Sequence, residues 1–155
     1  MQPIEPPWLI SARRELGVKE IPGPGDHPRI VEYLQTVDTL PANLQGNDET
    51  AWCSAFVGWN METQGFPSTE KANARSWLNW GVNLPEPAHG CVCVLWRNDP
   101  LSWKGHVGLL VGLESKSVML LGGNQGNAVT IQRYPLDRVL GYRWSEHQQW
   151  KGSTI

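Results

Sequence analysis

Apolar residues in the first half of the chain recur with the period of a helix. A helix is expected over residues 7–16, because its apolar positions share one face and Gly17 follows as a typical helix-ending residue. A short helix follows from Pro28, capped by Asp26. A third begins after Thr50, with an apolar face at positions i, i+3, i+4 and i+7 formed by Trp52, Ala55, Phe56 and Trp59. A fourth is expected over residues 70–80.

The second half changes to short apolar or alternating runs separated by Gly, Asn, Asp or Pro. This pattern is typical of strands joined by tight turns. Five strands are expected, at residues 91–96, 106–111, 118–121, 129–134 and 139–144. Helices followed by consecutive strands predict an α+β fold with an antiparallel sheet.

Length and charge narrow the class of protein. The 155 residues predict a single domain, 1–155, with a core over about 7–145 and a short polar C-terminal tail. A formal net charge of −2 offers no basic surface for nucleic acid, and no apolar run reaches the roughly 20 residues of a membrane span. The N-terminus lacks the regions of a secretory signal, so synthesis in the cytoplasm without a signal peptide is expected.

Three cysteines make a complete disulfide framework impossible. Cys91 and Cys93 share one face of an apolar strand, where cysteine behaves as a small apolar residue. A C-x-C pair alone is a poor zinc site, and neither a metal nor another cofactor is expected. Nine tryptophans are many for this length, and five could line an exposed apolar groove for a sugar or peptide, namely Trp59, Trp77, Trp80, Trp96 and Trp103.

The third cysteine has the setting of a nucleophile. With Thr50 as N-cap, Cys53 takes the third position of its helix, where free backbone N–H groups and the helix dipole favour a thiolate. The same N–H groups can receive the oxyanion that forms when a thiolate attacks an amide. Cys53 is therefore the candidate nucleophile.

His106 is the candidate base, because it opens an apolar strand at a position close to water. The segment Gly-Gly-Asn-Gln-Gly-Asn at residues 122–127 ends the strand expected beside it. An amide oxygen of Asn124 could fix the tautomer of His106, although the same segment is also a good turn. Gln125 would point to the other face and line the substrate groove.

Several motifs, in this order, resemble a known group of enzymes: Glu-Ile-Pro-Gly at 20–23, Trp-Cys-Ser-Ala-Phe-Val at 52–57, Gly-His-Val-Gly at 105–108, Leu-Gly-Gly-Asn-Gln at 121–125 and Gly-Tyr-Arg-Trp at 141–144. Together they resemble small bacterial and phage cell-wall hydrolases related to the CHAP and NlpC/P60 cysteine peptidases, which have a papain-like architecture. The acidic residue that many CHAP members carry near Gly122 is missing, His147 lies too far along to match a second NlpC/P60 histidine, and there is no aspartate-rich calcium loop.

The resemblance implies hydrolysis of an amide bond in the peptide part of peptidoglycan, as a phage lysin or a delivered antibacterial effector acting on the cell wall. Its catalytic residues would be Cys53, His106 and Asn124. The substrate-binding candidates are Asp48, Glu49, Trp52, Gln125 and Trp103; the two acids could instead favour the helix N-terminus. A monomer is expected, with an immunity or delivery protein as a possible partner.

Two other functions stay open. A non-catalytic wall- or glycan-binding protein would use the tryptophan groove and keep Cys53 as a packing residue. A toxin with the same Cys–His pair could act on another amide, as a deamidase or a transglutaminase-like enzyme.

Overall fold

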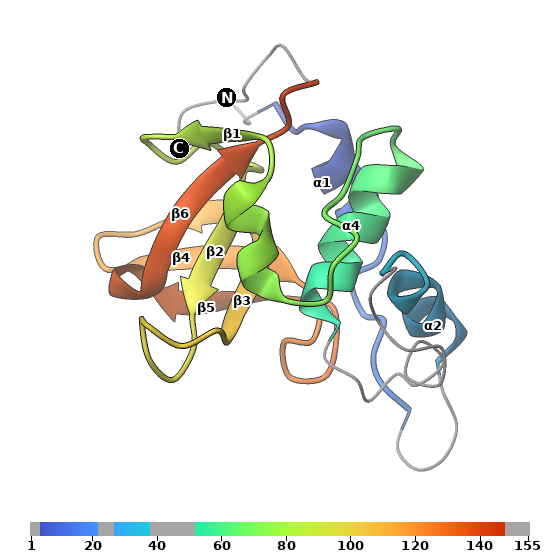
Figure 1. Ribbon diagram of the computed structural model, residues 1–155. Helices are drawn as coiled ribbons and strands as arrows, with labels where there is room; N and C mark the ends of the chain where they lie inside the picture. The colour runs from blue at the N-terminus through green and yellow to red at the C-terminus, as the bar shows by residue number, and fades with distance from the viewer. Residues whose placement is uncertain (1–3, 22–26, 38–51, 148–155) are drawn as a thin grey trace.

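The computed structural model describes residues 4–21, 27–37 and 52–147 (Figure 1). Within these ranges, helices come first and strands follow. The helical elements are α1 (Pro7–Arg13), α2 (Pro28–Leu34), α4 (Cys53–Thr63) and the 3₁₀ helix η1 (Ala74–Asn79). The strands are β1 (Val82–Leu84), β2 (Val92–Trp96), β3 (Gly105–Leu113), β4 (Ser117–Gly122), β5 (Thr130–Pro135) and β6 (Val139–Trp144), with a short 3₁₀ turn η2 (Leu136–Arg138) before the last.

The strands form one antiparallel sheet in the order β1-β6-β2-β3-β4-β5. The predicted combination of helices with an antiparallel sheet is confirmed, and β6 has the predicted bounds. The strand count of five is wrong, because the described sheet has six strands. The missed strand β1 is only three residues long and is defined by its pairing with β6, sixty residues later, so no alternating pattern could reveal it.

Helix α1 contacts the sheet directly, through β4. Helix α4 packs against β3 as well as against α1 and α2 (Figure 1). Most of its residues are consequently buried, from Cys53 to Met61. The expected single apolar stripe is too narrow a description, since a helix covered on both sides needs small or apolar residues all round.

Two expected helices are shorter in the structure. The first ends at Arg13 rather than Leu16, although Gly17 does adopt the left-handed conformation, with φ +97°. The helix expected over 70–80 is only the 3₁₀ helix η1, preceded by Glu70 with a positive φ of 57°. The expected caps Asp26 and Thr50 are wrong, because the N-cap of α2 is His27, whose Nδ1 accepts from the Arg29 N–H at 3.1 Å, and that of α4 is Trp52. Asp26, Thr50 and the tail beyond His147 themselves lie outside the described residues.

A short N-terminal segment, residues 17–20, is bound to the connection between β4 and β5. The Gly17 N–H donates to the Val129 carbonyl at 3.1 Å, and the Glu20 N–H donates to the Asn127 carbonyl at 2.8 Å. The Glu20 carboxylate also accepts a hydrogen bond from the indole of Trp52 at 2.8 Å. The segment therefore links the start of α4 to the connection that follows β4.

None of the described helices is long and apolar enough to cross a membrane.

Candidate active site

Cys53 is the first residue of α4. Trp52 is the N-cap residue and its side chain makes no capping hydrogen bond, so the expected third position of Cys53 is wrong by two residues. The first intrahelical bond runs from the Phe56 N–H to the Trp52 carbonyl, at 2.9 Å. The N–H groups of Cys53, Ser54 and Ala55 have no partner within the helix, and that of Ser54 donates to the sulfur of Cys53. An oxyanion beside Cys53 would meet these donors at the helix start.

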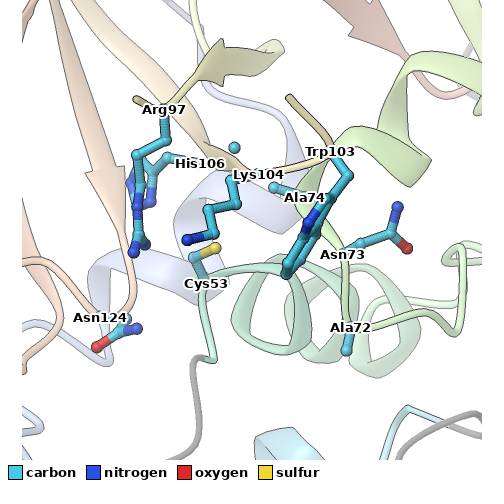
Figure 2. Close-up of a pocket in the computed structure, with 10 residues that line it drawn as sticks. Cys53, Ala72, Asn73, Ala74, Arg97, Trp103, Lys104, His106 and Asn124 are labelled. Atoms are coloured by element: carbon cyan, nitrogen blue, oxygen red, sulfur yellow. The ribbon is translucent and has the colours of Figure 1, made fainter. Parts of the chain in front are cut away.

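The structure brings Cys53 and His106 together, as the sequence analysis expected. β3 passes beside the N-terminal end of α4, and the thiol of Cys53 hydrogen-bonds to the imidazole of His106. Both side chains are nearly enclosed, at 7% and 8% exposure, and both reach the pocket shown in Figure 2. A nucleophile and a base in hydrogen-bond contact are what thiol chemistry needs.

The electrostatics of this pair favour the charged form. Burial raises the pKa of the Cys53 thiol, but the hydrogen bond and positive charge of His106 and the N–H groups of Val107 and Ser54 outweigh it, so the pKa is lowered overall. Burial likewise lowers the pKa of His106, and the thiolate of Cys53 outweighs it, so that pKa is raised. The pair can therefore hold a thiolate and an imidazolium together.

The other two thiols, those of Cys91 and Cys93, have raised pKa values. Cys91 and Cys93 are completely buried at β2, as expected of packing residues. Burial raises the pKa of Cys91 to about 12 and that of Cys93 well above its ordinary value. Both are protonated at neutral pH, so Cys53 is the described thiol suited to nucleophilic attack.

Gln125, and not Asn124, orients the histidine. The Nε2 atom of His106 lies 2.9 Å from Oε1 of Gln125. The Gln125 amide nitrogen donates to the carbonyl oxygens of Leu120 and Thr130, at 3.2 and 2.9 Å, which fixes the amide oxygen toward the ring. His106 must then carry its proton on Nε2, which leaves Nδ1 to face the thiol.

The expectation for Asn124 is therefore not met by the structure. Asn124 has a positive φ of 57° and lines the pocket, and its amide lies away from the ring of His106 in Figure 2. The left-handed turn at Asn124 brings the next side chain, Gln125, back beneath the strand. Gln125 is only 2% exposed, so its expected place in the substrate groove is wrong as well.

Tyr134 is a further contact of His106 that the sequence analysis missed. Its hydroxyl lies 3.2 Å from Nε2, and the two rings are tilted at 37° with centroids 5.1 Å apart. Tyr134 is the buried position of the otherwise exposed edge strand β5. A buried tyrosine among exposed neighbours is the signal that could have drawn attention to it.

The pocket above Cys53 has a volume of about 160 Å³. Trp103, one of the substrate-binding candidates, lies on its wall and is 73% exposed. Trp52, another candidate, is fully buried and cannot touch a substrate. Asp48 and Glu49 lie outside the described residues. The lining consists of Cys53, Ala72, Asn73, Ala74, Arg97, Trp103, Lys104, Gly105, His106 and Asn124.

No group of three or more His, Cys, Asp or Glu side chains that could hold a metal ion occurs in the described part of the chain.

Comparison with known proteins yields little. No protein-family model matches the chain, and no curated protein matches it. Among solved structures, it is similar to one from Staphylococcus aureus subsp. aureus Mu50 described as "similar to lipoprotein, NLP/P60 family", with 16% identity and a TM-score of 0.49. The match covers 96% of this chain and 45% of that one, so the chain spans less than half the length of that protein. A similarity this distant carries no argument about activity.

Proposed function

We propose that this protein is a papain-like cysteine amidohydrolase that cleaves an amide bond in the peptide part of peptidoglycan. The observation that carries the chemistry is the Cys53–His106 hydrogen bond at an open pocket, with His106 held by Gln125. The substrate class rests on the motifs that resemble cell-wall hydrolases.

The geometry supports a two-step reaction. The Cys53 thiolate attacks the carbonyl carbon, and the oxyanion that forms accepts hydrogen bonds from N–H groups at the start of α4. As the tetrahedral intermediate collapses, the C–N bond breaks and His106 gives its Nδ1 proton to the departing amine, which leaves a thioester. His106 then takes a proton from water, whose oxygen attacks the thioester and releases the acid and the thiol.

Gln125 makes this proton transfer possible without carrying a charge itself. Its oxygen accepts the Nε2–H of His106, so Nδ1 stays toward the sulfur atom in both protonation states. The role corresponds to that of the third group in other cysteine and serine hydrolases, which hold the tautomer and orientation of the histidine.

Digestion of purified peptidoglycan by the wild type and by Cys53→Ala tests the proposal. Mass spectrometry should find fragments with new amino groups in the wild-type digest alone, and their masses identify the amide that is cut. Release of the same fragments by Cys53→Ala would refute the mechanism. Ammonia release from glutamine side chains, without wall fragments, would instead favour the deamidase alternative.

The glycan-binding alternative finds less support in the structure. Of the five tryptophans considered for a groove, Trp77 is fully buried and Trp80 is 8% exposed, and only Trp103 lines the pocket. Cys53 also contacts a histidine instead of merely filling space.

A further inference from the structure

One side of the pocket is strongly basic. Its charged lining residues, apart from the catalytic pair, are Arg97 and Lys104, at the two ends of the connection between β2 and β3. No acidic side chain lines the pocket among the described residues. In Figure 2 both cationic side chains extend into the pocket, with the amino group of Lys104 directed toward Cys53.

Neither cation forms an ion pair within the described ranges. Other basic residues there do, since Arg13, Arg29 and Arg133 each lie within 3.0 Å of a carboxylate oxygen. Lys104 instead places its amino group 5.9 Å from the ring centroid of Trp103, which holds it over an aromatic face at the pocket wall.

The connection that carries the two cations is held in place by Arg75. Its guanidinium donates to three backbone carbonyls of this connection, those of Lys104 at 2.8 Å, Pro100 at 2.9 Å and Asp99 at 3.1 Å. At the end of the connection, Gly105 lets β3 lie close to β2. A Cβ at this position would come within 2.8 Å of the Leu95 carbonyl oxygen. The cations are therefore attached to a fixed scaffold, which reduces the entropy lost when a ligand binds.

A concave site lined by one sign of charge attracts ligands of the opposite sign. We propose that Lys104 and Arg97 form an anion subsite that binds a carboxylate of the substrate on a residue next to the scissile amide. This inference rests on the proposed function for the identity of the substrate. It adds that the enzyme discriminates a free carboxylate from a carboxamide at that residue.

The first test replaces the substrate by two alkylating reagents. Iodoacetate carries a carboxylate and iodoacetamide carries a carboxamide, and the two are otherwise alike. The ratio of their rates at Cys53 should fall about fivefold in the Lys104→Gln, Arg97→Gln double variant, as expected for loss of two partly exposed charges. Any change in the thiolate fraction alters both rates alike and cancels in the ratio. Lys116→Gln and Arg14→Gln, which remove exposed charges elsewhere, should leave the ratio unchanged. An equal ratio in the double variant and the wild type overturns the proposal.

The second test uses two synthetic stem peptides that differ only in a free carboxylate or a carboxamide beside the scissile amide. The wild type should cleave the carboxylate peptide with the lower KM, and the double variant should lose this preference, whereas Lys116→Gln should keep it. Equal KM values for the two peptides in the wild type overturn the proposal. The wild type could cleave neither the peptides nor peptidoglycan, while the ratio of the iodoacetate rate to the iodoacetamide rate still falls in the double variant. In that case the proposed function fails and the anion subsite stands.

Discussion

Replacement of His106 by alanine gives the sharpest test of the thiolate pair. Cys91 shows what burial does to a thiol without a cationic partner, since its pKa rises from an ordinary 9.0 to about 12. Cys53 is almost as buried, yet its pKa lies below 9.0. The partners of Cys53 thus account for the large difference in pKa between the two thiols.

Most of that difference comes from His106, with smaller parts from the N–H groups of Val107 and Ser54. In His106→Ala the burial remains and the main compensation is lost, so the pKa of Cys53 should rise above the ordinary thiol value. At pH 7 the thiolate fraction would then be no more than about 1%. In the wild type the thiolate fraction of Cys53 at the same pH should be larger, because its pKa is lowered.

The assay is the rate of iodoacetamide labelling at each cysteine from pH 4 to pH 10, followed by peptide mass spectrometry. The inflection for Cys53 should lie below 9.0 in the wild type and above it in His106→Ala. Cys91 and Cys93 serve as slow internal references, and His147→Ala, which alters an exposed histidine, should match the wild type. An unchanged inflection in His106→Ala would show that the helix amides alone lower the pKa, and the reasoning on the pair would be wrong.

Three further predictions concern the surroundings of His106 and of Trp52. Gln125→Ala should lower kcat by about 10- to 100-fold, whereas Asn124→Ala should have a far smaller effect; the reverse order in steady-state assays would restore Asn124 as the orienting residue. Tyr134→Phe removes a hydroxyl 3.2 Å from Nε2 and with it an acceptor for the imidazolium, so the alkaline limb of the pH profile of kcat should move to lower pH. A superimposable profile would argue against that contact. Gly123→Ala should destabilise the fold by about 1–3 kcal/mol in urea denaturation, because the added Cβ would lie 2.5 Å from the buried ring of Trp52; full stability would mean that the loop can move away.

The strands could be predicted from sequence because their burial alternates or runs continuously between turn residues. β6 has the expected bounds, and the bounds of β2, β3, β4 and β5 lie within two residues of the predicted ones. Cys53 and His106 were singled out by local setting, and the structure brings them together; their catalytic roles stay predictions.

The residue that orients His106, Gln125, could not be predicted from the sequence pattern of its loop. Strand alternation predicts side-chain direction only while the backbone stays extended, and Asn124 leaves that conformation with φ 57°. One left-handed residue is enough to exchange the roles of two neighbouring amides. Asn and Gln have the same chemistry, so composition offered no way to choose between them.

The start of α4 was misjudged for a related reason. A threonine three residues before Cys53 matches a capping pattern, but the helix begins at Cys53 itself, after an N-cap tryptophan. The indole of that tryptophan is held by Glu20, which lies 32 residues earlier in the chain. A helix start determined by a distant contact cannot be located from local propensity.

The contact of residues 17–20 with the β4–β5 connection has a consequence for how the protein acquires its activity. The Gly17–Val129 bond joins residues 112 positions apart (129 − 17), among the most costly contacts in chain entropy to form early. It braces the loop that carries Gln125, while Glu20 braces the residue before Cys53. We expect the reactive thiolate to emerge late in folding, after most of the chain has been made, so that a nascent chain carries an inert cysteine. A fragment that starts after residue 20 should fail to develop the fast-labelling thiol, although none of the removed residues lines the pocket.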